Sequence, residues 1–250
     1  MLKWPGKIMR GADEETKAIP RLGFHKTKTG NYYLPEGIAT DVIINAIKRG
    51  DIFEPQILDV ARRYIKPGTA VLDVGANFGQ MSVLFSPLVG ERGRVFAFEA
   101  DDFIYDALNK NIDANERSNI TAVFGAVSDK DGEVVFYPTP DFKRFGSYGS
   151  YGIDPKAKEG RKVPTITIDK MAIELPISFM KVDIQGSDLF ALRGAVKTIE
   201  KNRMPIIFEF EEQFQEEFGT SLKDYMDFVE DIGYRVEEIV DGINYLVVPK

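Results

Sequence analysis

The chain has 250 residues, 44% of them apolar, no cysteine and a formal net charge of −7. This composition suits one α/β domain with a sizeable core, and it argues against a disordered chain and against a general nucleic-acid binder, which needs a basic surface. Disulfides and thiolate zinc sites are excluded. The sequence has neither a bilayer-length apolar run nor an apolar leader, which predicts a cytoplasmic protein without a membrane span.

Residues 1–50 are expected to form an N-terminal extension with one helix, ahead of a main domain over residues 51–250. The first 30 or so residues are polar and interrupted by Pro and Gly, so we expect them to pack loosely. This segment contains His25, the one histidine of the sequence. A histidine could act as a general base, but we favour a structural or incidental position without a catalytic role. The apolar pattern from Thr40 to Gly50 predicts a helix capped by Thr40, and a second helix begins at Pro55.

The segment Val71–Gly79 predicts a buried strand, a tight glycine turn and the start of a helix. Its spacing is D-x-G-x-x-x-G, in which Asp73 precedes Gly75 and Gly79. A dinucleotide fold needs G-x-G-x-x-G, and an acid beside the turn would repel a pyrophosphate. The acid instead suits a ligand with an amino group, and S-adenosylmethionine has an ammonium, a sulfonium and a ribose. No P-loop motif is present.

A second strand over Val95–Glu99 places an acid where it can accept both hydroxyls of a ribose. Strands and helices alternate through this half of the chain, which predicts a parallel sheet with helices on both faces. The expected elements are Ala70–Val74, Gln80–Leu88, Val95–Glu99, Asp102–Ala114 and Ile120–Phe124.

An irregular insert, Asp141–Lys162, follows an extra strand over residues 133–138. Loops of this length are usually functional or disordered. The insert could fold over the mouth of a crevice and bring Tyr148 and Tyr151 to a substrate, or it could be a mobile surface loop; the sequence leaves both readings open.

The C-terminal half repeats the strand–turn–helix pattern. A strand over residues 179–184 is followed by a glycine turn, a helix over Leu189–Ile199 and a strand over Pro205–Glu211. A last helix precedes two strands joined by Asp241-Gly242, a dipeptide typical of hairpins.

Several blocks in this order resemble the FkbM family of S-adenosylmethionine-dependent methyltransferases, over roughly residues 31–211. They are the GANxG turn, FAFEA, AVSDKDGEVVF, TITIDK and KVDIQGSD. The resemblance implies a Rossmann-like class I methyltransferase: a mostly parallel seven-stranded sheet with an antiparallel hairpin edge and helices on both faces. The family usually has Glu where this chain has Gln185 and again where it has Asp188, which puts in doubt any role that needs a charge at position 185.

The resemblance implies an O-methyltransferase that acts on a hydroxyl of a small molecule or of a sugar in a glycan. The expected cofactor-binding residues are Glu54, Asp73, Gly75, Asn77, Gly79, Glu99, Ala100, Ala126 and Val127. Substrate contacts are expected from Tyr148, Tyr151 and Glu209. The alternatives are a fold that binds the cofactor without transferring methyl groups and acts as a regulatory or assembly partner, and a nucleotide-sugar or NAD enzyme, which the glycine spacing disfavours.

Asp183 is the first candidate for the base that deprotonates or orients the acceptor hydroxyl, because it ends a strand beside the crevice. Its competing role is to accept hydrogen bonds from the amides of the following turn. Lys181 is the second catalytic candidate: it faces the same side of the strand and can pair with Asp183 or with a neighbouring acid. A magnesium site built from Asp183, Glu209 and Glu211 is a minority option, and a metal is not expected.

Overall fold

The computed structural model describes residues 20–138 and 146–250. The first described elements are β1 (Leu22–Lys26) and β2 (Asn31–Pro35), which form an antiparallel hairpin. Loose packing was expected for residues 1–30, of which residues 1–19 lie outside the described chain; the expectation is wrong for the part within this hairpin. Asn115, just after α4 (Asp102–Ala114), explains why: its side chain accepts from the Asn31 amide at 2.8 Å and donates to the Asn31 carbonyl at 2.6 Å. Two asparagines therefore hold the hairpin against the main domain.

Helix α1 (Val42–Arg49) ends at Gly50 as predicted, but its cap is Asp41 rather than Thr40. Asp41 Oδ1 accepts from the Ile44 amide at 2.9 Å, whereas the Thr40 hydroxyl donates to the Gly146 carbonyl at 2.8 Å. Helix α2 (Pro55–Tyr64) begins with proline, as predicted. Proline suits this position because the first helical amide has no partner within the helix.

The main sheet has seven strands in the order β11-β12-β10-β9-β3-β4-β5. Strands β3, β4, β5, β9 and β10 are parallel, whereas β12 runs antiparallel to both of its neighbours. The predicted sheet with an antiparallel hairpin edge is confirmed. The strand bounds are β3 Ala70–Val74, β4 Arg94–Glu99, β5 Ile120–Phe124, β9 Ile177–Val182, β10 Ile206–Glu209, β11 Tyr234–Val240 and β12 Asn244–Pro249.

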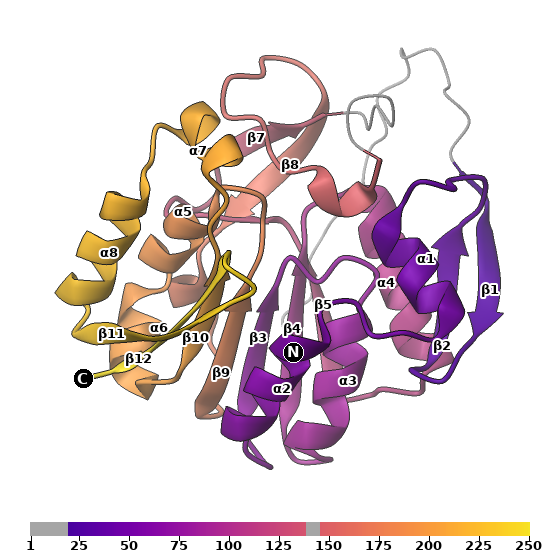
Figure 1. The fold of residues 1–250 in the computed structure, drawn as a ribbon, viewed down its shortest axis with the longest axis horizontal. Coiled ribbons are helices and arrows are strands. Elements are labelled where there is room, and N and C mark those ends of the chain that lie inside the picture. The colour runs from indigo at the N-terminus through magenta and orange to yellow at the C-terminus, as the bar shows by residue number, and fades with distance from the viewer. Residues whose placement is uncertain (1–19, 139–145) are drawn as a thin grey trace.

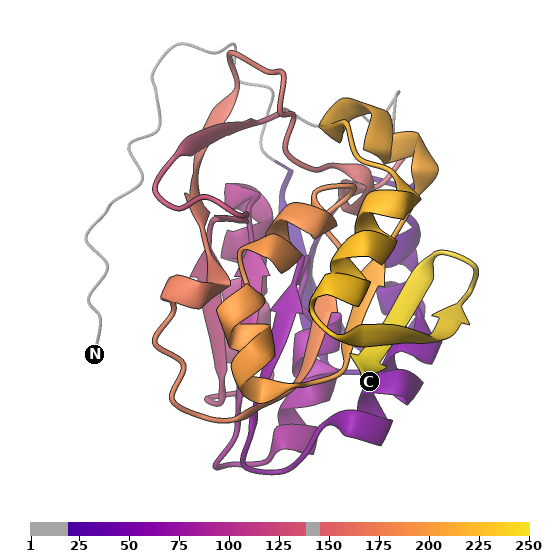
Figure 2. The ribbon, with the colours of Figure 1, turned by 90° about the vertical axis from the view of Figure 1, so that its left-hand side faces the viewer.

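Helices cover both faces of this sheet (Figures 1 and 2). Strand alternation sends Val71 and Phe179 into one core with α2, α3 (Gln80–Val89) and α4. Leu72 and Met180 enter the other core with α5 (Asp188–Arg193), α6 (Val196–Asn202) and α8 (Leu222–Asp231). None of the helices in residues 20–138 and 146–250 has the length and apolar character needed to cross a lipid bilayer.

The helix predicted over Leu189–Ile199 is two helices, α5 and α6. The cause is Asp169, in the short 3-10 helix η2 (Ile168–Lys170), whose carboxylate accepts from the amides of Lys197 and Thr198 at 3.0 and 2.8 Å. These hydrogen bonds cap a new helix start. A further helix, α7 (Glu212–Phe218), follows β10 and was not predicted.

A separate three-stranded sheet, in the order β6-β8-β7, lies beyond the carboxyl ends of the parallel strands (Figures 1 and 2). Its strands are β6 (Ala126–Val127), β7 (Val134–Tyr137) and β8 (Arg161–Ile166). The expected extra strand over residues 133–138 is β7. Between β7 and β8, the described part of the insert contains the 3-10 helix η1 (Tyr148–Ser150), which lies near α1 in Figure 1; residues 139–145 lie outside the described chain.

Candidate active site

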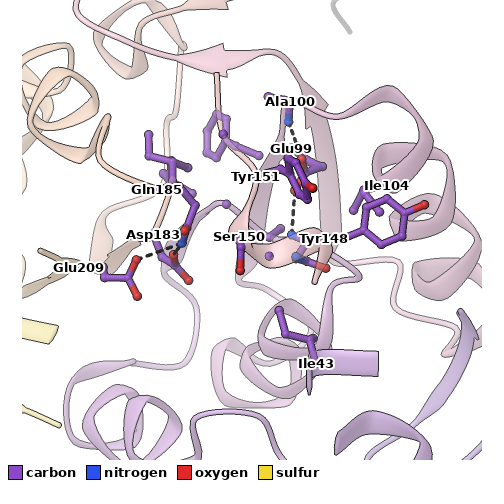
Figure 3. Close-up of a pocket in the computed structure, with 18 of the residues that line it drawn as sticks. Ile43, Glu99, Ala100, Ile104, Tyr148, Ser150, Tyr151, Asp183, Gln185 and Glu209 are labelled. Atoms are coloured by element: carbon purple, nitrogen blue, oxygen red, sulfur yellow. Dashed lines mark hydrogen bonds between the residues drawn. The ribbon is translucent and has the colours of Figure 1, made fainter. Parts of the chain in front are cut away.

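A cavity of about 470 Å³ opens at the carboxyl ends of β3, β4, β9 and β10. Parallel α/β sheets bind their ligands at this edge. Figure 3 shows two groups of side chains in it. Glu99, Ala100, Tyr148 and Tyr151 lie at one end, which we call the Glu99 end. Asp183, Gln185 and Glu209 lie at the other, which we call the Asp183 end.

The turn after β3 forms the floor between the two ends. Gly75 has a φ of +81°, and a Cβ built on it would lie 1.9 Å from the carbonyl oxygen of Asp183. Gly79, also at +81°, begins α3. Glycine is therefore needed at Gly75 for both the backbone conformation and the close approach of β9. Of the residues expected to bind the cofactor, Asp73, Gly75, Asn77 and Glu99 line the cavity, whereas Gly79 does not.

Glu99 organises the backbone around it. Its Oε2 accepts from the Asn77 amide at 2.9 Å, and its Oε1 accepts from the amides of Ala100 and Asp101 at 2.8 and 2.9 Å. Burial raises the pKa of Glu99 to about 7, although these three amides favour the ionised form. The carboxylate is thus fixed in direction, and a carboxylate oxygen retains a lone pair for a further donor such as a ribose hydroxyl.

Asp73 and Lys181 form a buried ion pair between adjacent strands β3 and β9. Lys181 Nζ lies 3.7 Å from Asp73 Oδ1 and 3.2 Å from Asp183 Oδ2, and it donates to the Gly75 carbonyl at 3.3 Å. Burial acts to lower the pKa of Lys181, but Asp183, Asp73 and Glu54 outweigh it and hold that pKa above its ordinary value. The raised pKa of Lys181 favours the charged ammonium, which suits an ion-pair partner for these acids better than a base.

Asp73 is fully buried, and the Ser82 hydroxyl donates to its Oδ2 at 2.5 Å. Its Oδ1 has no hydrogen-bond donor within the described chain. Burial raises the pKa of Asp73, whereas Lys181 and Ser82 oppose the rise. The cation nearest to this oxygen is Lys181 Nζ, at 3.7 Å, so the protein itself offsets the buried charge of Asp73.

Asp183 and Asp188 have separate tasks. Asp188 is fully buried and accepts from the amides of Ile184 and Gly186 at 3.3 and 3.2 Å, so it is Asp188 that holds the turn after β9. Burial, with Asp183 nearby, raises the pKa of Asp188 to about 7. The Asp183 carboxylate makes none of these turn contacts and lies in the cavity instead (Figure 3). Its side chain is 24% exposed.

Two further acids complete the Asp183 end. Burial, reinforced by the charge of Asp183, raises the pKa of Glu54 to about 7 and that of Glu209 well above its ordinary value. Gln185 donates one amide to both Asp183 and Glu209, at 3.3 and 3.1 Å. Within the described lining of the cavity, Lys181 is the sole cationic side chain.

The Glu99 end is closed by η1 and the three-stranded sheet. Tyr148 and Tyr151 are both buried, and the Tyr137 hydroxyl donates to the Tyr151 carbonyl at 2.7 Å. Ala126 and Val127, from β6, line the same end together with Ala100. The two tyrosines expected to contact substrate are therefore nearer to Glu99 than to Asp183, which suits contact with a cofactor (Figure 3).

Two further hypotheses from the sequence were a base at His25 and a magnesium site at Asp183, Glu209 and Glu211. His25 is in β1, paired across the hairpin with Tyr32, and does not line the cavity. Among residues 20–138 and 146–250, no group of three or more His, Cys, Asp or Glu side chains is arranged to hold a metal ion. Asp183, Glu209 and Glu211 all line the cavity, but the Gln185 amide occupies the space between the first two.

Sequence reasoning missed the contribution of the N-terminal segment to the cavity. Ile43 and Ile47, from α1, line it, and Asp41 Oδ2 accepts from the Tyr148 amide at 2.8 Å. The signal for Asp41 was present, since aspartate is a better helix cap than threonine. Its bond to η1 joins residues 107 apart in the chain and has no local pattern.

Comparison with known proteins identifies the family. The sequence profile of the Methyltransferase FkbM domain matches residues 73–236. Protein-L-isoaspartate O-methyltransferase 1 from Arabidopsis thaliana is 23% identical over 185 residues, covering 71% of this chain and 75% of that protein.

Two solved structures are similar to this chain. The methyltransferase FkbM from Methylobacillus flagellatus KT is 16% identical, with a TM-score of 0.46 over 82% of this chain and 52% of its own. The precorrin-6y C5,15-methyltransferase from Geobacter metallireducens GS-15 is 14% identical, with a TM-score of 0.44 over 78% of this chain and 89% of its own. On the family match, which spans more than half of the sequence, this chain belongs to the FkbM family and is an S-adenosylmethionine-dependent methyltransferase.

Proposed function

We propose that this enzyme methylates a hydroxyl of an uncharged small molecule or of a sugar in a glycan, and that Asp183 is its base. One observation carries the proposal: Asp188 holds the turn after β9, which leaves the Asp183 carboxylate directed into the cavity. A hydroxyl must lose its proton during methylation, and a carboxylate at the acceptor end can take it.

The described residues fit the cofactor. Glu99 suits the ribose, and Asn77 and the Gly75 turn, with the buried Asp73 oxygen beneath them, suit the amino-acid portion. Ala100, Ala126 and Val127 offer an apolar wall for the adenine ring of the cofactor. When bound, S-adenosylmethionine supplies a methyl group activated by its sulfonium.

The protein's own contribution is positioning and proton transfer. Holding the acceptor oxygen in line with the methyl group supplies much of the rate. Asp183 orients the acceptor hydroxyl and takes its proton, while Lys181 Nζ lies 3.7 Å from Asp73 Oδ1 and 3.2 Å from Asp183 Oδ2 and holds these two side chains in place. Glu54 lies on the same side of the cavity.

Charge favours a neutral acceptor. Four acids, Glu54, Asp183, Glu209 and Glu211, line the Asp183 end, and Lys181, the one cation in the described lining, is already paired with Asp73 and Asp183. A phosphate or carboxylate in this partly buried site would therefore find no cation to offset its charge. This argument supports a hydroxyl acceptor over nucleic acid or a protein carboxyl group. The expected cytoplasmic location remains a prediction.

The test is methyl transfer from radiolabelled S-adenosylmethionine to a panel of neutral methyl glycosides and phenols, with total RNA and an isoaspartyl peptide in parallel. Titration with S-adenosylhomocysteine first establishes that the preparation binds cofactor. Label in the glycosides or phenols supports the proposal. Label confined to the RNA or to the peptide, or no label in a preparation that binds cofactor, contradicts it.

A further inference from the structure

The side chain of Gln185 lies between the two acids that end β9 and β10. Val182 and Phe208 are directly paired in these parallel strands, so Asp183 and Glu209 are the next residues on neighbouring strands. Gln185 Nε2 donates to Asp183 Oδ1 at 3.3 Å and to Glu209 Oε2 at 3.1 Å (Figure 3). An amide nitrogen has two hydrogens, one for each acid.

The backbone holds Gln185 firmly in this place. Its φ is +53°, in the left-handed region, where a residue other than glycine needs support from its surroundings. Asp188 gives that support by binding the amides on either side, those of Ile184 and Gly186. Gly152, in the insert between β7 and β8, also packs against Gln185: a Cβ built on Gly152 would lie 3.1 Å from the Gln185 Cβ.

We propose that Gln185 is a positioning residue, whose uncharged amide ties Asp183 to Glu209 and aims the Asp183 carboxylate at the acceptor. Asp183 Oδ2 is held by Lys181 at 3.2 Å, so the amide on Oδ1 removes the remaining freedom of the carboxylate to rotate. A carboxylate held at both oxygens is pre-organised for its task.

The absence of charge at position 185 is part of the argument. The groups that face this bridge from the surrounding elements are Glu54, Asp73, Lys181, Asp188, Glu209 and Glu211. Five of these six are acids. A glutamate at position 185 has the same length but cannot donate to either neighbour unless it is protonated, and it adds a further acid beside a single lysine.

This role rests on the proposed function, so the first measurement uses neither cofactor nor acceptor. The melting temperatures of wild type, Gln185→Ala and Gln185→Glu are compared at pH 5 and pH 8. In Gln185→Glu, the surrounding acids favour the protonated form of the new carboxyl group, so its pKa is higher in the folded protein than in the unfolded chain. The stability that this group contributes to the folded protein is therefore lost as pH rises. We expect Gln185→Glu to lose about 4 °C more than Gln185→Ala between pH 5 and pH 8.

The second measurement separates positioning from structure. We expect Gln185→Ala to lower kcat about 10- to 100-fold on the methyl glycosides or phenols that wild type methylates, with KM for S-adenosylmethionine changed less than about twofold. The matched control is Asn202→Ala. Asn202 accepts from the Ile177 amide at the other end of β9, so this variant should lose stability and keep its kcat.

Each result decides the matter. The expected pH-dependent loss together with the fall in kcat supports the proposal. If the melting temperatures of Gln185→Ala and Gln185→Glu fall equally at both pH values, the amide bridge between Asp183 and Glu209 is overturned. If Gln185→Ala has the kcat of wild type, the positioning role is overturned. If wild type methylates none of the probes, the proposed function fails and the positioning role with it, whereas the melting temperatures still report on the bridge.

Discussion

The carbonyl oxygen of Asp183 lies against Gly75, at a point only 1.9 Å from where a Cβ on Gly75 would be. The cofactor turn after β3 and the proposed base after β9 are therefore in direct backbone contact. This close contact is possible because Gly75 has no Cβ.

Gly75→Ala should unfold the protein or lower its free energy of unfolding by more than about 3 kcal/mol, because backbone must move in addition to the strain of a positive φ. The matched control is Gly242→Ala. Gly242 has a φ of +80°, against +81° for Gly75, but no atom lies within 4 Å of its Cβ position. It should cost only about 1 kcal/mol. Equal losses in urea unfolding would show that the contact with Asp183 is unimportant.

Glu99→Gln should weaken binding of S-adenosylhomocysteine by roughly 1.5–3 kcal/mol, the scale of a hydrogen bond to a charged group. The substitution keeps the length of the side chain but places an NH₂ group against backbone amides that now meet carboxylate oxygens. Calorimetry measures the change, and Glu200→Gln, at an exposed site on α6, is the control. Unchanged affinity would remove Glu99 from the cofactor site.

Asp183→Asn should lower turnover about 10²- to 10⁴-fold, the usual contribution of a general base, and leave the affinity for S-adenosylhomocysteine within about threefold. The reason is that Asp183 lies at the acceptor end and does not hold the turn. Asp227→Asn, whose partner is the exposed Lys223, is the control. Wild-type turnover in Asp183→Asn would exclude it as the base.

Lys181→Met should lower the free energy of unfolding by about 3–5 kcal/mol, because it leaves Asp73 buried without its counter-charge. The double variant Asp73→Asn with Lys181→Met should recover at least half of that loss. Lys223→Met, which removes an exposed pair, should leave the free energy of unfolding nearly unchanged. Urea unfolding measures all three. A double variant no more stable than Lys181→Met would contradict a pairwise origin.

Stability and cofactor binding should depend on pH in opposite directions. Burial raises the pKa values of Glu54, Glu99 and Asp188 to about 7, above their ordinary values of 4.5, 4.5 and 3.8. The stability gained from protonated acids is complete below the ordinary values and is lost as pH rises through 7, so the melting temperature should fall by about 5–10 °C from pH 5 to pH 8.

Over the same range these acids become charged, and S-adenosylmethionine carries a net positive charge. Its dissociation constant should therefore decrease as pH rises. Lys181 does not contribute, because its raised pKa keeps it protonated throughout. Thermal melts and calorimetry in matched buffers check both trends. A melting temperature that rises from pH 5 to pH 8 would contradict the assignment.

The sheet was predictable because its strands are apolar on both faces and alternate with amphipathic helices, so local patterns carry the topology. The hairpin β1–β2 was not. Each strand has five residues, and the contacts that hold the hairpin, with Asn111 and Asn115 and through the buried Tyr32 and Leu34, join residues far apart in the chain.

The candidate site likewise has a part that the sequence predicts and a part that it does not. Gly75 and Glu99 follow strands in a recognisable pattern, and the structure brings both to the cavity. The division of labour between Asp183 and Asp188 could not be read from the sequence, because both acids flank the same turn. The direction of each side chain decides which one holds the turn, and that direction depends on packing.

The carboxylate of Asp41 has a consequence for the boundary of the catalytic unit. One of its oxygens caps α1 and the other holds η1 at Tyr148, while Ile43 and Ile47 form cavity wall. Residues 41–47 thus supply one side of the cavity, and a version of the protein trimmed to begin at Asp51 would open the Glu99 end to water. Insertions and fusions that preserve the chemistry must therefore spare this segment, although it lies ahead of the glycine turn and the strand ends that line the cavity.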